Sequence, residues 1–423
     1  MFSDRLIHLL AKLGKADAAA RLRRRMAEAD GQAQVQAVAR PRFGRGASAA
    51  SAAKFWQDRA STQQEALCGA DVLAAIPDYA ANIENMIGMA RLPIGVAGPL
   101  AVRGLHACGE YLVPLATTEA ALVASYARGC HVISRAGGAV AALVSEGVLR
   151  TPAFVFADIL EAGEFVAWVT TQESAIRAAV SSTTRHGVLE EIEPVIDNDI
   201  VFLICRFTTG DASGQNMVTI ATDALCRHLV QHAPVAPRHW FVEGNFSGDK
   251  KASHLGLITG RGRKVSASVT IPAALIASLL QTDSAQMLAY ARVAALGAIL
   301  SGQIGAQGHF ANGLAALYIA TGQDAACVAE SAVGFTRMEP REDGALFMSV
   351  TLPNLMVGTV GGGTGLPGQR AALELMGLYG SSHAAALAEV TACLCLAGEI
   401  SIMAAIASGQ FTRAHDRLAR ERT

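Results

Sequence analysis

The sequence predicts an α+β protein in which a small α/β unit is inserted into a large, mostly helical body. The first observation is composition. The chain is 51% apolar but only 5% aromatic, which together with abundant alanine and glycine favours closely packed helices over a β-rich architecture. The second is a change of pattern after residue 150, where the β-like runs Phe154–Phe156 and Ile200–Ile204 flank helical stretches. At 423 residues, the chain is long enough for two or three domains.

Local signals predict the elements outside the inserted unit. Residues 1–39 have an amphipathic helical pattern, and the segment Arg40–Ala53, rich in Gly, Ser, Ala and Arg, is typical of a linker. From Pro272 onward, alanine-rich helical patterns dominate. One of them runs from about Ala384 to Ser408, and Gly409 is suited to end it.

Charge and cysteine content limit the classes of function and the cellular compartment that the sequence suggests. The net charge is −1, so no global basic field indicates nucleic acid or a membrane surface as a partner. The eight cysteines have no CxxC pairing, which argues against a disulfide framework or structural zinc and favours a reducing, cytosolic compartment. The uncharged run 293–323 contains several polar residues and glycines, so we expect a buried helix and a polar turn there rather than a membrane span.

The stretch Gly358–Gly365 contains five glycines. Each of them loses backbone entropy on folding and packs no side chain, so stability alone does not explain the run. Backbone amides in such a loop can approach a ligand closely. A phosphate-cradling loop and a plain tight turn are equally good readings of these residues alone.

Two charged residues in separate segments could take part in acid–base chemistry. Glu119 follows Thr117 and Thr118 at the start of a helical pattern; the threonines can cap that helix, and an acid in its first turn is stabilised by the helix dipole. Capping alone explains this motif, although a buried acid there could also donate a proton. Lys250 lies in the turn-rich loop 244–251, where an ammonium can neutralise a carbonyl oxygen that gains negative charge. Asp-Lys-Lys sequences are also common on surfaces.

Two further residues complete the set. Asp324 ends a long uncharged stretch and needs a partner, because a buried unpaired carboxylate is costly; Lys250 is the candidate. His415 lies in the polar C-terminal tail, where a histidine is usually inert but could protonate a leaving thiolate near neutral pH. A Glu, a Lys, an Asp and a His beside a glycine loop fit carbonyl reduction. No metal-ligand spacing, GxSxG elbow or Walker loop is present in the sequence.

Together with Glu84–Gly88 and Leu92–Leu100, these segments resemble the 3-hydroxy-3-methylglutaryl-CoA (HMG-CoA) reductase family over roughly residues 80–415. The resemblance implies NADPH as cofactor, HMG-CoA and CoA as ligands, no membrane anchor, and a homodimer or higher homo-oligomer with shared active sites. It also implies an order of domains. This is an N-terminal helical segment and linker at 1–53, a large substrate domain at 54–150 and 241–408, an inserted ferredoxin-like NADP-binding domain at 151–240, and a C-terminal flap at 409–423.

The resemblance implies roles for individual residues. Glu119 matches the family's catalytic acid, Lys250 the lysine that polarises the carbonyl, and Asp324 the carboxylate that tunes both. His415 matches the acid that protonates departing CoA. The implied substrate-binding residues are Arg150, which matches the family's arginine for the substrate's free carboxylate, and Asp249, Lys251, His309, Asn312 and Ser125. The implied cofactor-binding residues are Thr184, Arg185, Asp211, Ser213, Gly214, Gln215, Asn216, Gly358, Thr359, Gly361 and Gly362.

Several positions depart from the family pattern. Glu243 stands where the family has serine against the substrate, and a carboxylate there would repel an anionic acyl group unless it is paired or turned away. Ala127 and His131 replace polar and basic residues on the CoA side, and Gly256-Leu257 replaces Asn-Trp. Two alternatives therefore stay open. One is a diverged reductase for a different acyl-CoA, and the other is a catalytically silent regulator that binds CoA or a dinucleotide.

Overall fold

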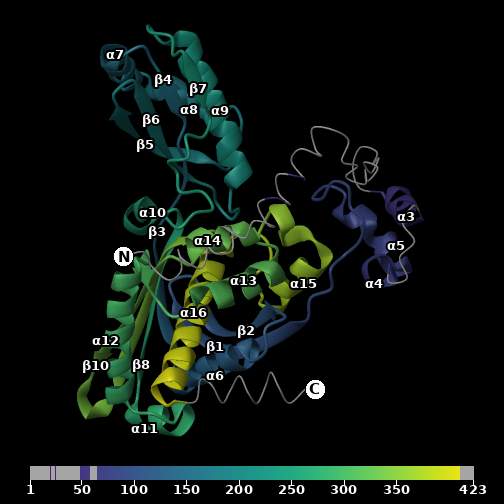
Figure 1. The fold of residues 1–423 in the computed structure, drawn as a ribbon, viewed down its shortest axis with the longest axis vertical. Helices are drawn as coiled ribbons and strands as arrows, with labels where there is room; N and C mark the ends of the chain where they lie inside the picture. Colours follow the sequence, from purple (N-terminus) through teal and green to yellow (C-terminus); the bar gives the residue numbers. More distant parts are fainter. Residues whose placement is uncertain (1–19, 21–23, 25–47, 58–63, 410–423) are drawn as a thin grey trace. The chain divides into compact units, whose positions relative to one another are not determined.

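The structure is a computed structural model that describes residues 20, 24, 48–57 and 64–409 (Figure 1). The chain divides into two units, residues 1–89 and 90–423, which are described separately. The first unit contains the helices α3 (Ala49–Gln57), α4 (Gln64–Cys68) and α5 (Ala70–Tyr79). They enclose a small core, and the indole Nε1 of Trp56 donates a hydrogen bond to the carbonyl of Ile87 (2.6 Å).

The second unit is built on a large mixed sheet. Its strands follow the order β3-β8-β11-β10-β9, and β1 pairs with both β2 and β3. The bounds are β1 (Ile94–Gly104), β2 (Cys108–Ala116), β3 (Ala139–Arg150), β8 (Gly262–Ile271), β9 (Gly305–Ala306), β10 (Gly334–Pro340) and β11 (Leu346–Leu355).

Helix α16 (Ala384–Ala407) is the centre of the core. It packs against β8, β11, β3 and α6 (Leu122–Arg135), and most of its residues are buried. Within the described chain it is the one helix long and apolar enough to cross a membrane, but 83% of its most apolar window is buried inside the protein. A helix that is apolar on all sides and enclosed by sheet and helices is a core helix.

The remaining helices of this unit lie between and after these strands along the chain. They are α10 (His254–Thr259), α11 (Ala273–Leu275), η1 (Ile276–Leu280), α12 (Ser284–Ser301), α13 (Phe310–Thr321), η2 (Ala325–Cys327), α14 (Val328–Ser331), η3 (Glu342–Gly344), η4 (Gly362–Gly365) and α15 (Pro367–Leu375).

Between β3 and β8 the chain forms a smaller α/β segment. Its elements are β4 (Ala153–Val155), α7 (Ile159–Val169), α8 (Glu173–Ser181), β5 (Val188–Asp197), β6 (Ile200–Thr208), α9 (Gln215–His232) and β7 (His239–Phe241). The strands pair antiparallel in the order β5-β6-β4-β7. The last residues of β3 pair with β6, so one long strand connects the large sheet with this segment.

The body has many helices, as expected, but the prediction missed the large sheet at its centre. In β8 the side chains of Val265, Ala267, Val269 and Ile271 are buried and alternate with more exposed residues. That period of two is the signature of a strand. The intervening serines and threonine are small. The alanine-rich composition of the chain favoured the prediction of helices.

Other expectations have mixed outcomes. The β-like runs are strands β4 and β6, and the helix predicted at 384–408 is α16, followed by Gly409 with φ +67°. The predicted linker is partly wrong, since α3 begins at Ala49; residues 1–19, 21–23 and 25–47 lie outside the described part. The uncharged run contains buried α13 but also the end of α12, where Val293, Leu296, Ile299 and Leu300 are exposed, so the expectation of burial fails there. All eight cysteines are free thiols.

Candidate active site

The glycine loop lies between two other segments that the sequence singled out. Gln323 holds it with two hydrogen bonds, accepting from Gly358 N (2.8 Å) and donating to Gly358 O (3.0 Å). On the other side, a Cβ atom at Gly358 would lie 2.5 Å from the backbone nitrogen of Ser213. Only glycine fits such an approach. The structure therefore brings the segments 211–213, 322–324 and 358–365 together.

Two different structural features of this loop favour glycine: close backbone packing at some positions and positive φ angles at others. Gly358 and Gly363 pack closely on neighbouring backbone, and a Cβ at Gly363 would lie 2.7 Å from Gly322 O. Gly361 and Gly362 have positive φ angles of 74° and 55°, and within the described chain a Cβ there would meet nothing within 4 Å. The second pair thus borders open space, which suits a loop that faces a ligand.

Lys250 and Asp324 form the predicted pair, with Nζ and Oδ2 2.8 Å apart. Both side chains are partly exposed, at 44% and 39%, so the expectation of a deeply buried carboxylate is wrong. The hydrogen bond to Asp324 raises the pKa of Lys250. Burial pulls the pKa of Asp324 upward, but the Lys250 ammonium and the Ala326 N–H outweigh it, and this pKa lies below its usual value. Both groups are therefore charged at neutral pH.

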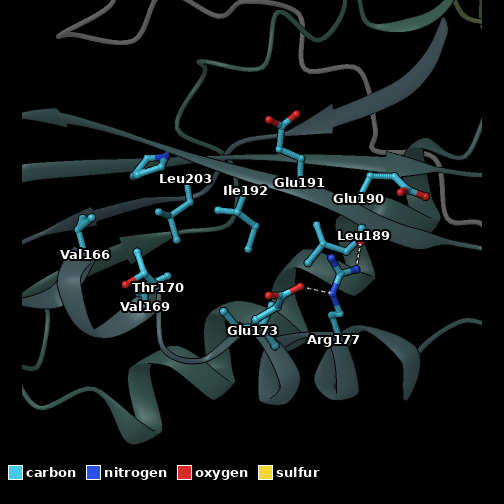
Figure 2. Close-up of a pocket in the computed structure, with 12 residues that line it drawn as sticks. Val166, Val169, Thr170, Glu173, Arg177, Leu189, Glu190, Glu191, Ile192 and Leu203 are labelled. Atoms are coloured by element: carbon cyan, nitrogen blue, oxygen red, sulfur yellow. Dashed lines mark hydrogen bonds and ion pairs between the residues drawn. The ribbon is translucent and has the colours of Figure 1, made fainter.

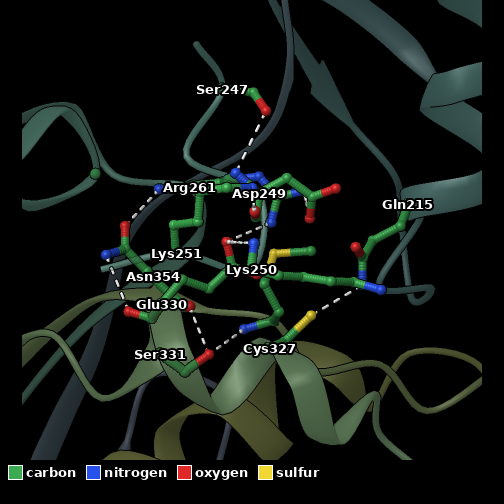
Figure 3. A network of polar contacts seen from close by, with 12 residues as sticks. Gln215, Ser247, Asp249, Lys250, Lys251, Arg261, Cys327, Glu330, Ser331 and Asn354 are labelled. Carbon is green, nitrogen blue, oxygen red and sulfur yellow. Dashed lines mark hydrogen bonds and ion pairs between the residues drawn. The ribbon is translucent and has the colours of Figure 1, made fainter. Parts of the chain in front are cut away.

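A buried ion pair fixes the backbone of Lys250. Lys250 has φ +57°, a conformation that costs a non-glycine residue on the order of 1–3 kcal/mol, and its N–H donates to Glu330 (3.2 Å). Glu330 in turn pairs with Arg261 (2.7 Å), and both side chains are almost fully buried. Figure 3 shows this network around Lys250. Burial raises the pKa of Glu330, and Arg261 opposes the shift.

Sequence reasoning missed Arg261 and Glu330. The available signal was a lone charge within an apolar stretch, since Glu330 is the single acid between Ala325 and Val333. A buried carboxylate requires a buried cation.

Arg150 holds two carboxylates. Its NH1 lies 2.9 Å from Glu243 Oε2 and 3.2 Å from Asp249 Oδ2, while the Nζ of Lys251 donates to the carbonyl of Asp249 (2.9 Å). Glu243, which departs from the family pattern, is therefore paired. Its partner, Arg150, is the arginine that the resemblance assigned to the substrate carboxylate.

Glu119 is not in the first turn of a helix. Helix α6 begins at Leu122 after Ala121, which has φ +69°, so the expected capping by the threonines is wrong. The left-handed residue interrupts the backbone before the helix starts. Thr117 Oγ1 instead accepts a hydrogen bond from Glu119 N (3.0 Å), and the exposed Glu119 carboxylate accepts from Asn312 Nδ2 (3.4 Å).

His309 is positioned by a carboxylate that the sequence did not reveal. Glu399 of α16, fully buried, accepts hydrogen bonds from the backbone N–H groups of Gly308 and His309, each at 2.8 Å. The His309 ring packs beside Tyr126 at 5.2 Å, and its buried Nε2 has no hydrogen-bond partner among the described residues.

Within one chain, these residues form two separate groups. Glu119, His309 and Asn312 lie at the N-terminal end of α13, and Ser125 nearby contacts Ser401 (2.8 Å). The Lys250–Asp324 pair lies beyond the C-terminal end of α13. The helix has 12 residues, which is about 18 Å at 1.5 Å per residue. One chain thus does not bring Glu119 to Lys250, and His415 lies outside the described residues.

The expected cofactor residues cluster around the start of α9. Gly214 precedes this helix with φ +76°, Gln215 and Asn216 are in its first turn, and Gln215 Nε2 reaches Asp324 Oδ2 (3.4 Å). Asp211 does not point to open space: it accepts hydrogen bonds from Ser382 N (2.7 Å) and Ala384 N (3.1 Å) at the start of α16. Its carbonyl accepts from Thr359 N (2.8 Å).

The segment Thr184–Arg185 lies beside the same helix. Thr184 Oγ1 contacts the sulfur of Met217 in α9 (2.9 Å). Arg185 is exposed and makes no ion pair within the described chain, so its guanidinium is available to an anion.

A separate cavity of about 250 Å³ lies between α7, α8 and the strands β5 and β6 (Figure 2). Its wall is largely apolar, and Glu173 pairs with Arg177 at its edge (2.9 Å). None of the predicted site residues lines it.

The comparisons with known proteins agree on one family. Residues 49–420 match the family described as hydroxymethylglutaryl-coenzyme A reductase. A 3-hydroxy-3-methylglutaryl-coenzyme A reductase of Aeropyrum pernix is 43% identical over 348 residues, covering 81% of this chain and 82% of the relative. One of Halobacterium salinarum is 45% identical over 351 residues, covering 81% and 86%.

A solved structure also shares the fold. It is the class II 3-hydroxy-3-methylglutaryl-CoA reductase from Streptococcus pneumoniae bound to NADPH in open conformations, with a TM-score of 0.63 at 20% identity. The match covers 84% of this chain and 95% of that one.

Proposed function

Because the chain belongs to the hydroxymethylglutaryl-coenzyme A reductase family, we propose that it reduces HMG-CoA to mevalonate and CoA with two molecules of NADPH. The observation that carries this proposal is the Lys250–Asp324 pair (2.8 Å), in contact with the segment that holds the glycine loop. The direct test is HMG-CoA-dependent oxidation of NADPH with release of the CoA thiol.

The charged residues have distinct tasks in this reaction. Lys250 stabilises the negative charge that develops on the carbonyl oxygen, first of the thioester and then of the aldehyde. Asp324 keeps the Lys250 ammonium in place. When the C–S bond of the hemithioacetal breaks, His415 protonates the CoA thiolate. Glu119 supplies the proton that converts the second oxyanion to the alcohol.

NADPH supplies the two hydrides when it is bound. The residues that would hold it fit that cofactor: Gly361 and Gly362 border open space, the N-terminus of α9 is a natural anion site, and Arg185 is an unpaired, exposed guanidinium among the described residues. Thr184, Ser213 and Asn216 would complete this binding surface beside α9.

The inserted segment fits a ferredoxin-like cofactor domain at 151–240. Support comes from its element sequence, strand-helices-strand-strand-helix-strand, and from the antiparallel order β5-β6-β4-β7. The substrate domain then comprises 54–150 and 241–408, the segment 1–53 precedes it, and 409–423 is the flap that carries His415.

The active site is shared between two copies of the chain. Support comes from the separation of Glu119 and Lys250 by the length of α13. The exposed apolar residues Val293, Leu296 and Leu300 on one side of α12 also suit a second copy as partner. A cytosolic location fits this function and the free cysteine thiols.

The Arg185 assignment predicts cofactor preference. A guanidinium can bind the 2′-phosphate that NADH lacks, so NADPH should be the better substrate. Arg185→Ala should raise KM for NADPH about tenfold or more and leave KM for NADH nearly unchanged. Steady-state kinetics with both cofactors provide the measurement, and Arg177→Ala, in the neighbouring helix α8, is the control. Equal use of both cofactors by the unaltered protein contradicts the assignment.

The His415 assignment predicts a difference between the two reduction stages. Only the first stage expels a thiolate, so His415→Gln should lose most HMG-CoA reduction but retain reduction of free mevaldehyde. Parallel assays with the two substrates measure this ratio. An equal loss in both assays means that His415 has a general structural or binding role.

A further inference from the structure

Glu243 forms an ion pair with the guanidinium of Arg150. The two side chains are 2.9 Å apart, and Ser247 Oγ donates a second hydrogen bond to the same oxygen of Glu243 (2.9 Å). The Arg150 side chain is only 7% exposed and that of Glu243 is 24% exposed. An ion pair with so little solvent is screened much less than a surface pair.

The other carboxylate that pairs with Arg150, that of Asp249, has a second cationic partner. Asp249 lies 3.2 Å from Arg150 but 2.9 Å from the buried Arg261, which also pairs with Glu330. Each of the two carboxylates has one buried oxygen without a hydrogen-bond partner, but Asp249 has two cationic partners, whereas Glu243 has only Arg150 among the described residues. Glu243 is therefore the less well satisfied carboxylate and the one that can exchange.

We propose that Glu243 is a specificity-determining residue that fills the position of the substrate's free carboxylate. This inference rests on the proposed function and on the role that the resemblance implies for Arg150, which is to bind that carboxylate. An acyl group with a free carboxylate must displace Glu243 or bind beside a guanidinium that is already neutralised. An acyl group without a carboxylate leaves the Arg150–Glu243 pair intact. The chain thus discriminates less strongly in favour of carboxylate-bearing acyl groups than it would with a neutral residue at 243.

A purely structural role for Glu243 has different consequences. If the pair only fastens the start of the loop 243–251 to the end of β3, its removal affects all acyl-CoA substrates alike. If Glu243 competes with the substrate carboxylate, its removal improves only the ligands that carry one. The comparison of two ligands therefore separates the roles.

The test uses the variants Glu243→Ser and Glu243→Gln in the full chain. The free acid 3-hydroxy-3-methylglutarate is the binding probe. Its Kd should fall on the order of tenfold or more in both variants, because removing a like charge from a partly desolvated site favours an anion. The ratio of kcat/KM for HMG-CoA to that for 3-hydroxy-3-methylbutyryl-CoA, which lacks the carboxylate, should rise by a similar factor through KM.

The matched control is Glu191→Gln, which removes a glutamate that faces Arg206 (3.7 Å) and makes no contact with Arg150. It should leave the Kd of the acid unchanged. Because the Gln variant preserves the shape of Glu243, it reports on charge even if the Ser variant folds poorly. Equal or weaker binding of the acid by the Gln variant overturns the proposal. If the unaltered protein reduces no HMG-CoA, the proposed function fails, while the binding comparison still decides the role of Glu243.

Discussion

Replacement of Lys250 by alanine is expected to lower kcat for HMG-CoA reduction by about a hundredfold or more, the loss seen when an oxyanion-stabilising donor is removed. The ammonium is held by Asp324 at 2.8 Å. Since its pKa is raised by that hydrogen bond, it remains charged across neutral pH. No neighbouring group replaces it within the described site, because Lys251 donates to the carbonyl of Asp249 and Arg261 is committed to Glu330.

The folded structure should tolerate this change. The N–H of residue 250 still donates to Glu330 in the alanine variant, and the Lys250–Asp324 pair is partly exposed, so its loss should change stability by no more than about 1 kcal/mol. Thermal unfolding checks this, and Lys54→Ala, an exposed lysine in α3, is the kinetic control. Near-normal turnover by a folded Lys250→Ala variant contradicts the role of Lys250.

Two inactive variants are expected to restore activity when they are mixed. Glu119→Gln and Lys250→Ala should each be nearly inactive alone, because each removes one part of every active site. If a site takes Glu119 from one copy and Lys250 from the other, a mixed dimer contains one site with both defects and one intact site. The unfractionated random mixture should then have about a quarter of normal activity, and the isolated mixed dimer about half.

The experiment requires co-expression of the two variants, with different affinity tags so that mixed dimers are isolated. Co-expression of Lys250→Ala with Asp324→Asn is the matched control. Lys250 and Asp324 pair within one chain, so each site of a mixed dimer keeps one defect and the mixture should stay inactive. An inactive Glu119→Gln/Lys250→Ala mixture means that each chain builds its own site.

The sequence predicted contacts that follow from a local physical need. Asp324 required a cation, and Lys250 is that cation. The alanine-rich helical pattern at 384–408 predicted a helix, and α16 is that helix. The glycine run was expected to allow close approach to a ligand, which stays a prediction, while the structure shows Gly358 packed closely on the backbone of Ser213.

What the sequence did not predict depends on distant segments. Glu330 and Arg261 are 69 residues apart, and nothing near either residue indicates the other. Glu399 accepts a hydrogen bond from the backbone N–H of His309, which lies 90 residues earlier in the chain. The start of α6 depends on the left-handed backbone of Ala121, a residue type that rarely adopts it, so the motif favoured an earlier helix start. The large sheet was missed because its alternating strands are rich in small residues.

The stoichiometry of a complete reaction tests the central claim most directly. Purified protein is incubated with limiting HMG-CoA and excess NADPH, and oxidised cofactor, free CoA thiol and mevalonate are measured together. Four-electron reduction predicts two NADPH oxidised for each CoA and each mevalonate formed, with no product from the Lys250→Ala variant. One NADPH per CoA with accumulation of an aldehyde, or no oxidation of NADPH by HMG-CoA, contradicts the account.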